Sequence, residues 1–433
     1  MKISKFGGSS VSNSSQFKKV KNIILSDQER QVVVVSAMGK DDSNSSKMTD
    51  LLFLLHTHLE LNINYDTLFD TIINRFMIVK KELQLSIDIE KELLEFKSEL
   101  HSKISKDYLV SRGEYFTARL MSEYLGFTFI DAADVLFVNY NGNIDYEKTI
   151  SKLQFAYDTH KQIVVPGFYA ITPDNEIRLF PRGGSDLTGS ILAKALQVEL
   201  YENWTDVDGI YSANPSIIKD ALQIEKITYG ELRELSYRGA NVLHQETIVP
   251  LEESTIPIVI KNTNNPDNKG TLITSKIKAN GNIMTGLSGK QDFTSFNITK
   301  RNNQSKIEVL RDVLDVFIRY NVNIEHIPSG IDTLSVVVES SSIQNNRFEI
   351  IRDIRNINGV LSMDVEHGIS LIAIVGRNMA NIPGIAGKLF SALGDNKINI
   401  KVIAQASTEL SIIVGVDNDN YESAIRVIYK KFF

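Results

Sequence analysis

The sequence contains no cysteine, which excludes disulfide bonds, thiolate catalysis and cysteine-based zinc sites. This absence fits a reducing compartment, and we expect a cytoplasmic protein. No apolar run approaches the roughly 18 residues that a membrane-spanning helix needs. The sequence begins with a strand-like segment, so we expect no signal peptide. The net charge is −6 and no long basic run occurs, so we expect neither nucleic acid nor a membrane as a partner.

Several common kinds of site are also missing from the sequence. The seven histidines show no metal-ligand spacing and no Ser-His-Asp arrangement. The phosphate-binding motif G-x-x-x-x-G-K-[ST] does not occur. Residues 206–209 read D-x-D-G, but the later ligand positions of a calcium loop do not follow. We therefore predict no metal site made by the protein's own side chains.

At 433 residues the chain is too long for one hydrophobic core, and two to three domains are expected. In the first two-thirds, apolar strand-like runs alternate with helical segments, which predicts a mostly parallel sheet covered by helices on both faces. The predicted strands are 31–37, 163–166, 199–201 and 256–260, and the predicted helices include 111–125 and 186–196. The charged stretch 65–106 lacks glycine and proline and is predicted to be a helical excursion from the sheet.

The pattern changes near residue 270. Residues 262–270 are dense in turn formers, and 276–282 are predicted to be a linker. After it, a strand, a helix, two strands and a helix follow twice. The predicted strands are 294–299, 322–327, 333–339, 370–375, 398–404 and 409–416. Two such units predict a duplicated ferredoxin-like module, and a single irregular α+β domain is the alternative.

The segment Lys5-Phe6-Gly7-Gly8-Ser9 stands where a first strand, 2–6, gives way to a first helix. Free N–H groups at such a helix start, together with the helix dipole, can bind an anion. Gly7 and Gly8 allow the backbone to approach a ligand, and Lys5 adds a mobile positive charge. The motif predicts a phosphate-binding turn. The alternative is an ordinary strand-to-helix turn closed by glycine.

Residues 182–186, Arg-Gly-Gly-Ser-Asp, repeat this pattern at the start of the helix 186–196. Arg182 could grip a carboxylate with two parallel N–H bonds, and Asp186 could accept from an ammonium group. An amino acid substrate presents both groups. The alternative is a helix cap, Ser185 or Asp186, preceded by a surface arginine.

Three further segments place polar groups at expected strand ends or helix starts. Glu114 is expected in the first turn of a helix, where the dipole favours its charge and where it would suit a substrate ammonium. Ser36 closes an apolar strand, at the end where ligands of open α/β sheets bind. Thr49 is expected at the start of the next helix, where it could simply be the N-cap. The loop 205–211 offers a hydroxyl, carboxylates and an aromatic ring that could border a purine.

The motifs KFGGSS, VVVSAMGK, KMTDLL, SRGE, PGF, RGGSD, TDVDGIYSANP and IKNTNNP occur in this order along the chain. Together they resemble the motifs of the aspartate kinases (aspartokinases) in the amino acid kinase family, and the paired C-terminal modules resemble that family's tandem ACT domains. The resemblance covers essentially the whole chain and is closest to the monofunctional kind, since no dehydrogenase follows Phe433. Met38 and Gln245 stand where relatives often carry proline, and Ser216 stands where some carry a basic residue near the nucleotide.

This resemblance implies an α/β/α sandwich of the amino acid kinase type over 1–277, followed by two α+β ferredoxin-like ACT domains, 283–365 and 366–433, that can be interleaved. It implies phosphorylation of the side-chain carboxylate of L-aspartate by ATP with Mg²⁺. The products would be ADP and 4-phospho-L-aspartate, in the first step towards lysine, threonine and methionine.

The resemblance also implies a role for each motif residue. Catalysis would be carried by Lys5, Arg182 and Asp186. Aspartate would be bound by Ser36, Thr49, Glu114, Arg182, Gly183, Ser185 and Asp186, with Arg182 on its α-carboxylate and Glu114 and Asp186 on its ammonium. ATP would be bound by Lys5, Gly7, Gly8, Ser9, Thr205, Asp206, Tyr211 and Asn264. Mg²⁺ would keep water and phosphate ligands, so few protein ligands are expected.

Feedback inhibition is expected through the ACT modules, with lysine, alone or with threonine, as the effector. Residues 322–332 are similar to the effector-binding stretch of the family's first ACT module, and the expected effector-binding residues are Asn323, Ile324, Glu325 and Gly330. The alternative is that Glu325 is a solvated strand residue and that the modules only dimerise. We expect a homodimer or homotetramer formed through the ACT domains. Two other functions stay open: a kinase acting on glutamate or acetylglutamate, and a non-catalytic amino acid sensor.

Overall fold

The computed structural model describes residues 1–433 except 182, 238–242, 244, 278–282, 303, 380–381, 406–407 and 409. The predicted linker 276–282 therefore lies mostly outside the described residues. The chain divides into two compact units. The first contains Met1–Ile210, Gln223–Tyr229 and Val242–Ile277, and the second contains Tyr211–Leu222, Gly230–Asn241 and Lys278–Phe433.

An eight-stranded sheet forms the centre of the first unit, with the strand order β3-β4-β2-β1-β7-β9-β10-β8. Neighbouring strands run parallel except β9 and β10. The strands are β1 (Lys2–Phe6), β2 (Arg30–Val35), β3 (Thr128–Phe129), β4 (Ile163–Pro166), β7 (Leu200–Thr205), β8 (Lys226–Thr228), β9 (Ile258–Asn262) and β10 (Thr271–Thr274). Residues 32–35 are fully buried, because consecutive β-branched residues suit a strand covered on both faces. The mostly parallel sheet predicted from the sequence is confirmed.

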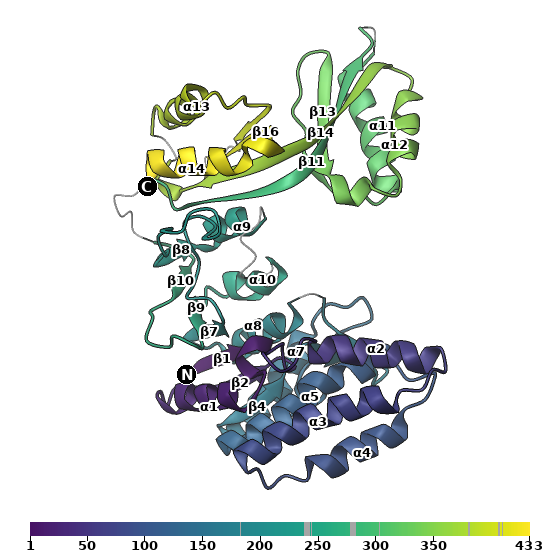
Figure 1. Cartoon of the computed structure of the whole chain (residues 1–433), viewed down its shortest axis with the longest axis vertical. Helices are drawn as coiled ribbons and strands as arrows, with labels where there is room; N and C mark the ends of the chain where they lie inside the picture. Colours follow the sequence, from purple (N-terminus) through teal and green to yellow (C-terminus); the bar gives the residue numbers. More distant parts are fainter. Residues whose placement is uncertain are drawn as a thin grey trace. The chain divides into compact units, whose positions relative to one another are not determined.

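Helices cover both faces of this sheet (Figure 1). The helices of the unit are α1 (Ser14–Leu25), α2 (Met48–Glu60), α3 (Asp66–Leu83), α4 (Ile89–Glu99), α5 (Lys106–Leu125), α6 (Ala132–Val135), α7 (Tyr146–His160), α8 (Gly184–Leu196) and α10 (Gln245–Glu253), and β5 (Tyr169–Ile171) and β6 (Ile177–Leu179) form a small hairpin. Strand alternation separates the two layers at β1, since Phe6 packs with residues of α1 and α5 whereas Lys5 reaches α8. Helices α2, α3, α4 and α5 pack against one another, which confirms the helical excursion.

The sequence predicts that the first helix follows Phe6 directly, but the structure does not have it there. A short 3₁₀ turn, Gly8–Val11, comes first. Helix α1 begins only at Ser14, because the Asn13 side chain accepts the N–H of Gln16 and caps the helix there. The free N–H groups predicted to bind an anion would therefore be those of the 3₁₀ turn and not those of α1.

Two other helix starts correct the sequence-based expectations. Helix α5 begins at Lys106, where Ser105 caps it, so Glu114 lies inside the helix and not in its first turn. The explanation of Glu114 by the helix dipole is therefore wrong, because that effect is confined to the first turn. Helix α2 begins at Met48, so Thr49 lies within the helix and is not its N-cap.

A six-stranded antiparallel sheet forms the centre of the second unit, with the strand order β12-β13-β11-β14-β16-β15. The strands are β11 (Gly286–Lys300), β12 (Ile324–His326), β13 (Thr333–Glu339), β14 (Val360–Val375), β15 (Val402–Gln405) and β16 (Ser411–Asp417). The helices are α9 (Tyr229–Tyr237), whose first residue belongs to the first unit, α11 (Lys306–Arg319), α12 (Arg347–Arg355), α13 (Ile385–Asp395) and α14 (Tyr421–Phe432).

The two long central strands of this sheet each serve two modules. The later part of β11, from Phe293, pairs with β13, whereas its first part, Gly286–Lys290, pairs with Leu371–Val375 of β14. That part of β14 also pairs with β16. Each module thereby has the four-strand order of a ferredoxin-like fold, and the second module takes its fourth strand from the start of β11. The predicted duplication is confirmed, and the single irregular domain is wrong.

Two segments from the first two-thirds of the chain belong to the second unit, namely 211–222 and 230–241. Glu231 of α9 accepts from Arg377 Nη1 with both carboxylate oxygens, at 2.9 and 3.0 Å. The hydroxyl of Tyr429 in α14 accepts the N–H of Leu222 at 3.1 Å. The predicted domain boundaries, 1–277, 283–365 and 366–433, stay predictions. Among the helices that the structure describes, none is long and apolar enough to cross a membrane.

Candidate active site

The glycine turn after β1 is held tightly against the loop that follows β2. The N–H of Gly7 donates to the carbonyl of Trp204 at 3.0 Å, and the N–H of Gly39 donates to the carbonyl of Gly8 at 2.9 Å. A Cβ on Gly8 would lie 2.9 Å from the Ala37 carbonyl oxygen, and one on Gly39 would lie 2.6 Å from the carbonyl carbon of Gly8. Both positions therefore require glycine. The turn presents the N–H groups at its start, which have no partner within it.

Lys5 extends from the end of β1 to the start of α8. It is 6% exposed, and its Nζ forms an ion pair with Oδ1 of Asp186. The side chain of Asn203, in β7, donates to the same oxygen at 2.9 Å. The ion pair and the burial hold this ammonium group in one position. The glycine turn begins two residues after Lys5 along the chain. The structure thus brings together two predicted site residues, Lys5 and Asp186, that are far apart in the sequence.

The start of α8 packs against the segment that follows β4. Gly183 is the N-cap in a left-handed conformation with φ of 81°, which favours glycine. A Cβ on Gly184 would lie 2.5 Å from Cδ2 of Phe168, and one on Gly167 would lie 2.6 Å from the Cβ of Ser185. The predicted residues Gly183 and Ser185 therefore lie beside the carboxyl end of a central strand, where ligands of open α/β sheets bind.

Glu114 presents a buried carboxyl group from α5. It is 3% exposed, and within the described structure its Oε2 has no hydrogen-bond partner. Burial raises the pKa of this carboxyl to about 8, and the Ala37 N–H and the charge of Lys5 oppose that effect only in part. A buried oxygen without a partner is costly, so this carboxyl suits a cationic ligand group that would complete its contacts.

Ser36 and Thr49 stand near the two ends of the loop that follows β2, and both are half-buried. The N–H of Ser36 donates to the carbonyl of Phe6 at 3.1 Å, which places Ser36 beside the end of β1. Thr49 is the second residue of α2. Their contacts with aspartate stay predictions. Arg182 lies outside the described residues, and its grip on a carboxylate stays a prediction as well.

The residues that were predicted to bind ATP through the later motifs have different surroundings. Thr205 ends β7, and its hydroxyl donates to the exposed Asp206 at 3.1 Å. Asn264 is exposed and faces α1, since its Oδ1 accepts from Lys19 Nζ at 2.7 Å. Tyr211 belongs to the second compact unit. The contacts of these residues with ATP stay predictions.

In the second unit, the predicted effector segment, residues 322–332, contains the edge strand β12 and the turn that leads to β13. Ile324 pairs with Val338, while Asn323 is exposed and Glu325 is half-buried. The carbonyl of Gly330 accepts from Lys306 Nζ at 2.7 Å. The segment is also held at Asp332, whose Oδ1 forms an ion pair with Lys300 Nζ at 2.8 Å. Its effector role stays a prediction.

Two residues beside this site were missed from the sequence. Asn203 binds the carboxylate of Asp186, and Gly39 packs against Gly8. Asn203 did carry a signal, because Glu202 and Asn203 are polar residues in an otherwise apolar strand and both are buried. Buried polar side chains in a central strand require hydrogen-bond partners, so their presence in the sequence indicates a polar site next to the strand.

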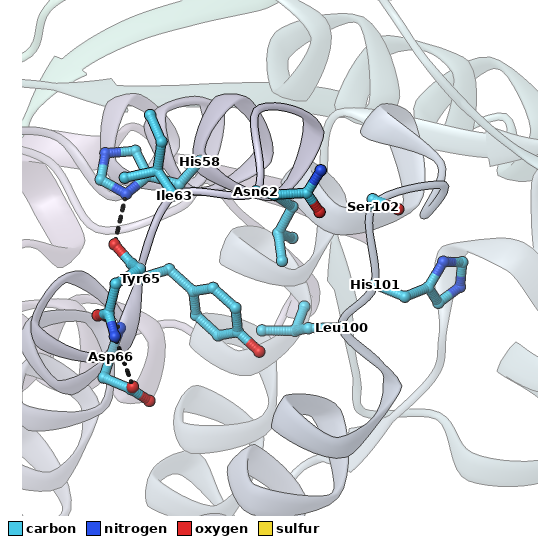
Figure 2. A pocket seen from close by; sticks show the side chains of 10 residues that line it. His58, Asn62, Ile63, Tyr65, Asp66, Leu100, His101 and Ser102 are labelled. Carbon is cyan, nitrogen blue, oxygen red and sulfur yellow. Dashed lines mark hydrogen bonds between the residues drawn. The ribbon is translucent and has the colours of Figure 1, made fainter.

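A separate cavity of about 470 Å³ lies where α2 ends, α3 begins and α4 ends (Figure 2). Its lining includes His58, Tyr65, Asp66 and His101, and His58 Nδ1 makes a hydrogen bond with the carbonyl of Asn64 at 3.0 Å. Figure 2 shows the rings of His58 and His101 well apart. No residue that the sequence singled out lines this cavity, so it is not part of the candidate active site.

Comparison with known proteins gives the family. Residues 1–262 match the model of the amino acid kinase family, and residues 372–432 match an ACT domain. The chain belongs to the amino acid kinase family. Within it, this amino acid kinase is 34% identical to aspartokinase 3 of Bacillus subtilis, over 100% of the chain and 99% of the relative. It spans 50% of a 28% identical bifunctional aspartokinase/homoserine dehydrogenase of Zea mays.

The solved structures agree with this placement. Aspartate kinase from Clostridium acetobutylicum superposes with a TM-score of 0.96 at 40% identity, and the match covers 100% of both chains. Aspartokinase III of E. coli, solved with aspartate and ADP, shares the fold with a TM-score of 0.79 at 23% identity. The resemblance to aspartokinases with ACT domains is confirmed, and so is the fold that it implied.

Proposed function

We propose that this kinase transfers the γ-phosphoryl group of ATP to the side-chain carboxylate of L-aspartate, which yields ADP and 4-phospho-L-aspartate. One observation carries the proposal: a buried lysine is held by Asp186 directly before a glycine turn, with a buried and incompletely bonded carboxyl, Glu114, nearby. This arrangement offers positive charge to phosphates and, when Glu114 is ionised, negative charge to an ammonium group. Full-length similarity to aspartokinases supports the same reading.

The chemistry needs no general base. The side-chain carboxylate of aspartate has a pKa of about 3.9 and is ionised at neutral pH, so no proton has to leave the nucleophile. The protein has to hold two anions in line and to neutralise the charge that develops between them. Lys5 and the N–H groups of the Gly7-Gly8-Ser9 turn would do this on the protein side. Mg²⁺, held mostly by phosphate oxygens and water, supplies further positive charge when it is bound.

Binding of aspartate would use the second cluster of residues. We assign Glu114 and Asp186 to its ammonium group, Arg182 to its α-carboxylate, and Ser36, Thr49, Gly183 and Ser185 to its positioning. The oxygen of Glu114 without a partner supports the first assignment. Asp186 has a second task, since its Oδ1 holds Lys5 and Asn203. Thr205, Asp206, Tyr211 and Asn264 are assigned to the nucleotide.

Regulation is assigned to the second unit. We propose feedback inhibition by lysine, alone or with threonine, through Asn323, Ile324, Glu325 and Gly330. E. coli aspartokinase III, which shares this fold, has been solved in complex with lysine and aspartate. We also propose a homodimer or homotetramer formed through the ACT modules. The location in the cytoplasm and the place in lysine, threonine and methionine synthesis stay predictions.

The experiment that tests the reaction is ADP release from Mg-ATP with L-aspartate, L-glutamate, N-acetyl-L-glutamate or no amino acid. We expect turnover with L-aspartate and much less with the others. Addition of hydroxylamine should trap the acyl phosphate as a hydroxamate only in the aspartate reaction. Equal turnover of aspartate and glutamate would assign another amino acid kinase activity, and no turnover with any of them would favour the amino acid sensor.

A further inference from the structure

We propose that Arg75 is a positioning residue for phosphoryl transfer, because its guanidinium closes the loop of residues 36–47 that packs against both the glycine turn and Glu114. This inference rests on the proposed function. Arg75 lies in α3, within the helical excursion, and belongs to none of the motifs that the sequence singled out.

The geometry is that of a clamp between two carbonyl groups of the same loop. Arg75 is 5% exposed. Its Nη2 donates to the carbonyl of Gly39 at 2.6 Å, and its Nη1 donates to the carbonyl of Ser46 at 2.9 Å. Gly39 stands near the beginning of the loop and Ser46 near its end. One planar fork of donors thus ties the two ends of the loop together.

The clamped loop contributes to both sides of the candidate site. On the phosphate side, the N–H of Gly39 donates to the carbonyl of Gly8, and there is no room for a side chain on either glycine. On the aspartate side, the N–H of Ala37 favours the ionised form of Glu114. The carbonyl of Gly39 faces Arg75 while its N–H faces Gly8, so one peptide segment connects the arginine to the glycine turn.

The middle of the loop has little other support. Asp42, Ser43, Ser45 and Lys47 are exposed. Asp41 and Asn44 bond to each other and close only the tip. Apolar packing therefore does not fix the loop between Gly39 and Ser46. The Met48 N–H donates to the Met38 carbonyl at 2.9 Å and closes the base of the loop, and Asn13 Nδ2 donates to Asp41 at its tip at 3.4 Å. The two hydrogen bonds of Arg75 hold the carbonyl groups that lie between these points. A hydrogen bond from a charged donor is stronger than a neutral one, which suits a contact that must hold backbone in place.

A purely structural role makes a different prediction. Burial lowers the pKa of Arg75, which reflects the cost of placing a cation in this position. If Arg75 only joined α3 to the rest of the unit, an uncharged side chain of similar length would change stability but would leave the kinetics of the folded enzyme unchanged. If Arg75 positions the loop, the folded enzyme itself becomes slower.

The test compares Arg75→Lys and Arg75→Met with a matched control, Arg119→Met. Arg119 lies in α5 and forms a two-point ion pair with Glu92 of α4, at 3.1 and 2.5 Å, so its removal also costs a bidentate arginine contact, here a half-buried one, within the same helical excursion. Each protein is assayed for aspartate-dependent ADP release at saturating substrates, for the KM of aspartate and of ATP, for Tm, and for hydrogen exchange of residues 36–47.

We expect Arg75→Met to lower kcat by about tenfold or more and to raise the KM of aspartate, with a Tm no lower than that of Arg119→Met. Arg75→Lys should recover Tm but not kcat, because one ammonium group cannot bond two separate carbonyls in the geometry of a fork. Hydrogen exchange of 36–47 should rise in both Arg75 variants and stay unchanged in Arg119→Met.

A kcat and KM within twofold of wild type in Arg75→Lys, with unchanged exchange of 36–47, overturns the inference even if Arg75→Met does not fold. Failure of the proposed function has a different signature, since wild type would then release no ADP that depends on aspartate.

Discussion

The affinity for aspartate is expected to rise with pH through the ionisation of Glu114. Burial raises the pKa of this carboxyl to about 8, so at neutral pH most molecules without substrate carry it protonated. Only the ionised form attracts the substrate ammonium. With a pKa of about 8, the ionised fraction is about 0.09 at pH 7 and about 0.76 at pH 8.5. The KM of aspartate should therefore fall about eightfold between these two pH values.

The assay is the KM of L-aspartate at saturating Mg-ATP, measured in half-unit steps from pH 6.5 to 8.5. Glu114→Gln is the control, because glutamine keeps the size of the side chain and cannot ionise. We expect the KM of this variant to be nearly independent of pH in the range. At pH 8.5 it should exceed the wild-type KM by about tenfold or more, which corresponds to the loss of a charged hydrogen bond.

The interpretation fails if the wild-type KM stays constant within twofold between pH 7 and 8.5. It also fails if Glu114→Gln shows the same fall as wild type, since another group would then be titrating. Among the described residues, Lys5 carries the charge that opposes the effect of burial on the pKa of Glu114. A midpoint well below 8 in wild type would mean that this lysine, together with the Ala37 N–H, outweighs burial.

Three further predictions concern stability, catalysis and regulation. The folded-state pKa of Glu114 is raised above its ordinary value of 4.5, so the wild-type protein loses stability as the pH rises from about 4.5 to 8. Glu114→Gln cannot ionise, so its free energy of unfolding in urea should gain about 3 kcal/mol relative to wild type between pH 5 and 8. A difference between the two proteins that stays constant with pH would contradict the shift. Lys5→Ala should lower kcat about a hundredfold or more, as for the loss of a preorganised donor, and a kcat close to wild type would restore the reading of 5–9 as an ordinary turn. Lysine should inhibit the wild-type enzyme about 5- to 150-fold and Glu325→Ala much less; if wild type ignores lysine, threonine and both together, the regulatory proposal fails, and if Glu325→Ala stays fully sensitive, only the site assignment fails.

The central strands could be predicted from the sequence because their cause is local. Residues 32–35 are consecutive valines, and such a run is stable only where both faces of a strand are buried. The strand 163–166 and the strand 333–339 were predicted with the bounds that the structure has. The positions of the glycine motifs were likewise readable, since close backbone approach leaves glycine as the only choice.

Helix starts were less accessible, because a cap depends on which of several polar residues finds a free N–H. Ser105 and Asn13 act as caps where the sequence had favoured other positions. The error mattered for Glu114, whose burial inside α5 and raised pKa come from the elements packed around it and not from a helix terminus. Composition alone cannot distinguish a carboxyl in the first turn from one buried two turns later.

Tertiary structure alone decided which residues meet. Lys5 pairs with Asp186, and Arg75 with Gly39, only because the sheet order and the helical excursion bring distant segments together. In the second unit, the repeated pattern revealed two modules but not that the start of β11 completes the second one. Local propensity determines which segments become strands, whereas the pairing of strands and the partners of buried charges depend on contacts between segments that no short stretch of sequence encodes.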